Sequence, residues 1–87
     1  MVKRERVPIA VEVIFDKTGA MIPRRVIMEY DSYHVDRFLG KRTHCPYCIP
    51  VSGMVEQYVV IISGYRKNLY YEPKTNMWFS VLNEEYY

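Results

Sequence analysis

Apolar residues recur at every second position over residues 7–15, and this alternation constrains the fold more than any other feature of the sequence. Successive side chains of a β-strand point to opposite sides, so a spacing of two places one face of the strand against a core. Helical periodicity over about ten or more residues is not found anywhere in the chain. We therefore predict an all-β protein. The alternating residues are Val7, Ile9, Val11, Val13 and Phe15.

Turn-forming residues divide the chain into six expected strands. The segment Asp16-Lys17-Thr18-Gly19 is typical of a hairpin turn, because Gly19 tolerates the positive φ that such turns need. The strand expected over 54–63 contains an unbroken apolar run, which predicts that both of its faces are buried. We expect a six-stranded antiparallel meander, closed into a small barrel or sandwich of SH3-like scale, since closure removes exposed edges. The strands are expected over 7–15, 24–30, 33–39, 54–63, 69–72 and 77–82.

The third expected strand departs from strict alternation. Val35 and Phe38 are three positions apart, so a bulge or a helical turn near Asp36-Arg37 is needed to bring both side chains to the core. Six further apolar residues are expected to be largely buried in one core, on the inward faces of the first, fourth and sixth strands. They are Phe15, Tyr58, Val60, Ile62, Trp78 and Phe79.

The length and composition predict one soluble domain over residues 1–87. A chain of 87 residues that is 49% hydrophobic is too short to build two cores. It contains no apolar run approaching the roughly 20 residues of a membrane span, and its first residues do not form a signal peptide. A cytoplasmic protein is expected, and two cysteines three positions apart do not make a disulfide scaffold.

A resemblance to known proteins is carried by Pro23 and Val26, by the segments 29–39 and 69–72, and by the pair Trp78-Phe79. The sequence resembles a group of short bacterial proteins of Gram-positive type without an assigned activity. It is similar, more weakly, to a small domain found alongside relatives of Y-family DNA polymerases. This resemblance implies a small β fold and no activity.

The sequence Cys45-Pro46-Tyr47-Cys48 is similar to the glutaredoxin active-site motif, but its surroundings differ. A redox dithiol of that class lies at the start of a helix, and the residues up to Gly53 leave no room for one. A structural zinc site needs four ligands, whereas this pair supplies two. His34, or a second copy of the loop in a homodimer, would have to complete the site. We favour a surface loop over 40–53 with inert thiols, and keep zinc or redox sensing as an alternative.

Basic pairs beside tyrosines suggest a different kind of site. Such a composition is found in small barrels that bind nucleic acid through phosphate contacts and base stacking. If the loops that carry these pairs lie at the same end of the barrel, their side chains form one patch. The net charge of +2 is a weak signal for such a partner. The residues concerned are Lys41, Arg42, Tyr47, Tyr65, Arg66 and Lys67.

From these observations we predict that the protein is a non-catalytic interaction module. The sequence offers no Ser/His/Asp set and no glycine-rich phosphate-binding loop, so we do not expect an enzyme. An unidentified protein partner is the favoured hypothesis. The first alternative is a nucleic-acid-associated module, and the second is a zinc- or redox-responsive protein that uses Cys45, Cys48 and His34.

Overall fold

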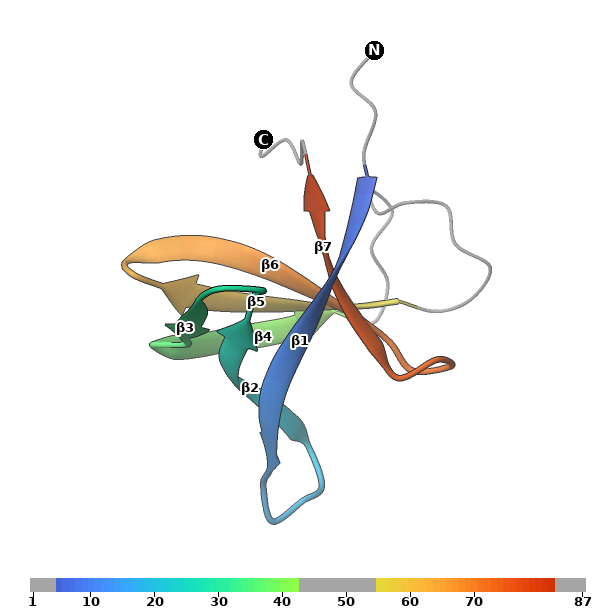
Figure 1. Cartoon of the computed structure of the whole chain (residues 1–87). Helices are drawn as coiled ribbons and strands as arrows, with labels where there is room; N and C mark the ends of the chain where they lie inside the picture. The colour runs from blue at the N-terminus through green and yellow to red at the C-terminus, as the bar shows by residue number, and fades with distance from the viewer. Residues whose placement is uncertain (1–4, 43–54, 83–87) are drawn as a thin grey trace.

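The computed structural model describes residues 5–42 and 55–82, and these residues form antiparallel strands (Figure 1). The all-β prediction is therefore confirmed. None of the described residues belongs to a helix, so no helix able to cross a membrane is found among them. The seven strands of the described ranges are β1 (Glu5–Phe15), β2 (Met21–Ile27), β3 (Ser32–His34), β4 (Arg37–Arg42), β5 (Glu56–Ile62), β6 (Tyr65–Glu72) and β7 (Met77–Leu82).

The strands form one curled sheet, a half-barrel, in the order β3-β2-β1-β7-β6-β5-β4. The order of the strands in the sheet departs from their order in the sequence at two places. The first and last strands pair with each other, with Ile9 opposite Trp78. The expected third strand is divided in two, and its halves, β3 and β4, lie at the two ends of the strand order. The observed sheet thus has seven strands where six were expected.

A sharp bend at Val35-Asp36 explains how one segment of chain reaches both ends of the sheet. The backbone N–H of Val35 donates to the carbonyl of Arg24 on β2 at 2.9 Å. The N–H of Asp36 donates to the carbonyl of Ile61 on β5 at 2.8 Å. Because consecutive residues bond to strands from opposite ends of the order, the bend ties β2 to β5 and holds the sheet in its curled form.

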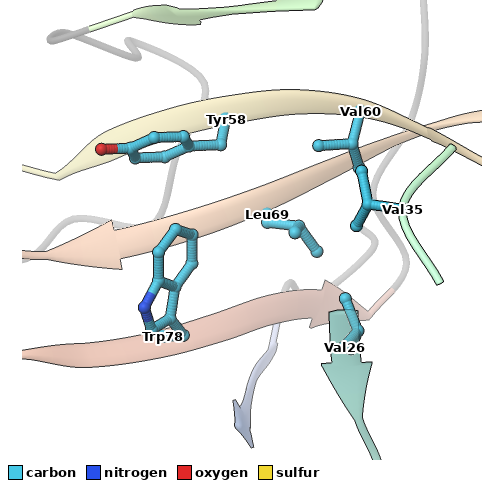
Figure 2. Packing of buried hydrophobic residues seen from close by; sticks show 6 residues of the cluster. All are labelled: Val26, Val35, Tyr58, Val60, Leu69 and Trp78. Atoms are coloured by element: carbon cyan, nitrogen blue, oxygen red, sulfur yellow. The ribbon is translucent and has the colours of Figure 1, made fainter. Parts of the chain in front are cut away.

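The main core fills the inside of this curl. Its buried side chains come from β2, β5, β6, β7 and the bend, and they point toward one another (Figure 2). The Tyr58 and Trp78 rings lie 4.9 Å apart, and Phe38 adds a third ring 5.8 Å from Tyr58. The bend at Val35-Asp36 brings both Val35 and Phe38 to the core side, close to the irregularity predicted near Asp36-Arg37. The register shift of β4 lies further along, between Phe38 and Gly40. The buried members are Val26, Val35, Tyr58, Val60, Leu69 and Trp78.

The prediction of one core was wrong for two of its six residues. Phe79 is buried, but it belongs to a second cluster with Val55 and Tyr70, where its ring stacks on Tyr70 at 5.5 Å. Adjacent residues of a strand point to opposite faces, so Phe79 cannot share the core of Trp78. Phe15 is 68% exposed, because it lies at the end of a hairpin that extends beyond the rest of the sheet (Figure 1). Ile62 packs at the margin of the main core.

The strand boundaries also differ from those expected. β2 begins at Met21 and includes Pro23, which is buried opposite Val13 beside a register shift in β1. β6 begins at Tyr65, because Ser63 and Gly64 both have positive φ and make a tight two-residue turn directly after β5. The expectation that both faces of β5 are buried is confirmed at Tyr58, Val59 and Val60.

Candidate functional site

The two basic pairs singled out from the sequence do not lie in two loops at one end of the sheet, the arrangement expected to form a single patch. They lie on β4 and β6, on either side of β5. Lys41 and Arg42 belong to strand β4, not to a loop, and Lys41 is opposite Tyr58. Arg66 and Lys67 follow the β5–β6 turn, and Arg66 is opposite Ile61. The prediction failed because β4 continues past Gly40, which carries Lys41 away from that turn.

Lys41 is engaged in a structural ion pair. Its Nζ lies 2.8 Å from Oε2 of Glu56, a side chain that is only 14% exposed, and it also lies 5.9 Å from the centre of the Tyr58 ring. Burial, followed by the charge of Glu56, raises the pKa of Tyr58 to about 12. The hydroxyl of Tyr58 is hydrogen-bonded to the same carboxylate. These contacts secure one end of the main core and leave Lys41 less available to a partner.

Arg66 has a basic neighbour that the sequence analysis did not select. Arg37 on β4 and Arg66 on β6 both lie opposite Ile61 on β5, on the outer face of the sheet. With adjacent strands about 4.8 Å apart, the two arginine backbones are separated by roughly 10 Å. Both side chains are exposed, and neither forms an ion pair within residues 5–42 and 55–82. Only the strand register reveals this proximity.

Tyr65 and Lys67 lie on the opposite side of the same strand end. The Tyr65 ring is 70% exposed, and Nζ of Lys67 is 5.9 Å from its centre. The turn that precedes Tyr65 is also held by a side chain from another segment of the chain. The N–H of Ser63 donates to the carboxylate of Asp36 at 3.0 Å. We call the surface formed by Arg37, Tyr65, Arg66 and Lys67 the basic tip.

Another charged group stabilises the second hydrophobic cluster. Glu72 is almost completely buried and accepts a hydrogen bond from the Thr75 hydroxyl at 2.8 Å. Nη2 of Arg6 lies 3.6 Å from the same carboxylate, and its guanidinium sits 4.0 Å from the centre of the Phe79 ring. Arg6 therefore holds β1 against β7 and β6 through both charge and ring contact.

The proposed metal and redox residues are only partly accounted for. Cys45, Tyr47 and Cys48 lie outside the described residues. His34 is exposed on β3, opposite Arg25. Within the described ranges, no group of three or more His, Cys, Asp or Glu side chains could hold a metal ion. Zinc binding or redox sensing by this set of residues stays a prediction.

Comparison with models of known protein families, with curated proteins and with solved structures finds no match to this chain. The resemblance described from the sequence is therefore an expectation still to be tested. The proposals about function therefore rest on the geometry of the strands and their side chains.

Proposed function

We propose that this protein is a non-catalytic interaction module, a small cytoplasmic barrel of SH3-like scale that binds its partner through the basic tip. The observation that carries the proposal is the exposed ring of Tyr65 among arginine and lysine side chains that have no acidic partner in the described part of the chain. Tyrosine and arginine are the residue types enriched where binding energy concentrates in protein interfaces.

The positions of the acidic side chains support a binding role over a catalytic one. Each acidic side chain described on the strands forms an ion pair with a basic side chain. These acids are Glu12, Glu56 and Glu72. The carboxylate of Asp36 accepts the N–H of Ser63. That of Asp16 accepts hydrogen bonds from Thr18 and Ala20 within its turn. Each of these groups has a structural role that explains its presence.

Site-specific photo-crosslinking tests this proposal. A photoreactive aromatic residue is placed at position 65 and, as a control, at Phe15, an exposed aromatic position on the β1–β2 hairpin. In extracts of the source organism, the variant at position 65 is expected to give a discrete adduct that excess unmodified protein suppresses. Equal labelling from both positions, insensitive to the competitor, would contradict a binding surface at the basic tip.

A nucleic-acid partner is the second candidate. It is favoured by one specific observation, the combination of an exposed aromatic ring with cations that lack acidic partners.

A further inference from the structure

Cations outnumber acids on the part of the sheet formed by β4, β5 and β6. The Asp36 carboxylate also lies there, where it accepts the N–H of Ser63. Four exposed cations on β4 and β6 form no ion pair within the described residues. The acids Glu56 and Glu72 in this part are already paired with Lys41 and Arg6. A surface of this kind attracts anions more than the net charge of the chain suggests. The four cations are Arg37, Arg42, Arg66 and Lys67.

The edges of the sheet are protected against the addition of a partner strand. β4 is interrupted by a register shift between Phe38 and Gly40, and it carries three cations along its length. At the other end of the order, β3 pairs only with residues 25–27 of β2, and the uncovered part of β2 carries Pro23. Bulges, charges and proline are the devices that keep edge strands from pairing with other chains. A partner is therefore expected to bind through side chains and not by extending the sheet.

The basic tip combines two kinds of side chain that recognise the same polymer. The Tyr65 ring offers a flat, exposed surface at the first residue of β6, directly after the Ser63-Gly64 turn, and base–aromatic stacking tolerates any base. Arg37 and Arg66 flank Ile61 on the outer face, where guanidinium groups form paired hydrogen bonds with phosphate oxygens. Lys67, near the limiting distance of a cation–π contact with Tyr65, is held only weakly and is free to reach a phosphate.

We propose that the basic tip binds single-stranded nucleic acid without sequence specificity, with Tyr65 stacked on a base and Arg37, Arg66 and Lys67 on phosphates. This inference rests on the proposed function and names the chemistry of the partner. A single strand fits better than a duplex, because its bases can leave their neighbours and stack on a side chain. An acidic peptide would also satisfy the cations, but it has no bases to stack on the exposed face of the ring.

Fluorescence anisotropy with labelled single-stranded oligonucleotides of mixed sequence, at about 50 mM salt, measures this binding directly. Binding is expected below about 100 μM protein, the range of non-specific complexes. Three phosphate contacts predict that the logarithm of the affinity falls with the logarithm of salt with a slope of about −2. No anisotropy change up to that concentration overturns the inference.

A charge-matched pair of variants locates the site. The double variant Arg37→Glu/Arg66→Glu is expected to weaken binding about tenfold or more, and equally on every sequence, because phosphate contacts carry no base information. Lys17→Glu/Lys74→Glu changes the net charge by the same amount in two other turns, β1–β2 and β6–β7, and is expected to cause a much smaller loss. Equal losses in the two variants overturn the assignment to the basic tip.

Substitution of the ring tests stacking separately from charge. Tyr65→Leu is expected to weaken binding to normal oligonucleotides about 5- to 150-fold, the range that corresponds to the loss of one stacked base. Tyr65→Phe should retain the affinity. On an oligonucleotide without bases, the wild type and Tyr65→Leu should bind equally, which a general disturbance of the fold would not produce. An equal loss on both kinds of oligonucleotide contradicts stacking.

A polyglutamate peptide distinguishes the competing partner. If the peptide binds at the basic tip and the oligonucleotides do not, the nucleic-acid inference fails and the partner is an acidic protein segment. The proposed interaction module would then stand. If neither polymer binds and the residue at position 65 forms no specific crosslink, the proposed function itself fails.

Discussion

At the scale of the residue, Asp16 shows how one side chain fixes a turn. Its carboxylate accepts hydrogen bonds from the Thr18 hydroxyl at 2.6 Å, the Thr18 N–H at 2.8 Å and the Ala20 N–H at 3.0 Å. The Thr18 hydroxyl contributes most to lowering the pKa of Asp16, followed by the N–H groups of Ala20 and Thr18. The sequence predicted this turn correctly, because Asp and Gly at its ends have well-defined roles in turns.

The lowered pKa of Asp16 predicts a loss of stability in acid. A carboxyl group with a lower pKa in the folded state favours folding above its unfolded pKa, which is 3.8 for a free aspartate. This contribution disappears as the pH falls below about 4 and through the folded pKa. In thermal melts, wild type should therefore lose more stability than Asp16→Asn between about pH 5 and pH 2. Parallel pH profiles for the two proteins would contradict the role assigned to the Asp16 carboxylate.

At the scale of the element, the strand pair β6–β7 shows what sequence patterning can and cannot predict. Tyr70-Tyr71 and Trp78-Phe79 are adjacent aromatic residues, and adjacent residues on a strand point to opposite faces. The pairs therefore indicate a sheet that is buried on both sides. In the structure, the two sides correspond to two separate hydrophobic clusters. The sequence does not say which member of each pair faces which cluster, since this depends on the strand register.

Trp78 is predicted to be the most costly truncation in these strands. Its ring lies between Tyr58, at 4.9 Å, and Tyr71, at 5.0 Å. Trp78→Ala should lower the free energy of unfolding by about 3 to 5 kcal/mol, as large aromatic truncations in cores do. Phe15→Ala removes an exposed ring and should change the free energy of unfolding by about 0.5 kcal/mol at most. Denaturant unfolding of both variants checks this, and similar losses in the two would show that the core assignment is wrong.

The cysteine segment is outside the described residues, so its prediction rests on the sequence alone. If the loop is inert, Cys45→Ser/Cys48→Ser should leave the melting temperature within a few degrees of the wild type. Metal analysis of protein purified without an affinity tag provides the complementary measurement. Stoichiometric zinc that is lost together with folding in the double variant would show that the site is structural.

At the scale of the whole molecule, the fold class and three residues of the basic tip, Tyr65, Arg66 and Lys67, could be predicted, whereas the fourth, Arg37, could not. Alternation at residues 7–15 and the apolar run on β5 were sufficient for an all-β protein, because burial patterns depend on local spacing. The pairing of Arg37 with Arg66 across Ile61 depends on long-range register. That register is fixed by the turn at Ser63-Gly64 and by the bend at Val35-Asp36, whose hydrogen bonds leave no periodic signal.

Nuclear magnetic resonance mapping of the backbone amides during titration with a single-stranded oligonucleotide tests the central claim most directly. We predict that the largest shifts fall on Arg37, Tyr65, Arg66 and Lys67, and that the amides of the β1–β2 turn, including Lys17, hardly move. Shifts centred on the β1–β2 turn, or no shifts at about 100 μM protein with excess strand, would contradict the assignment of the basic tip as the binding surface.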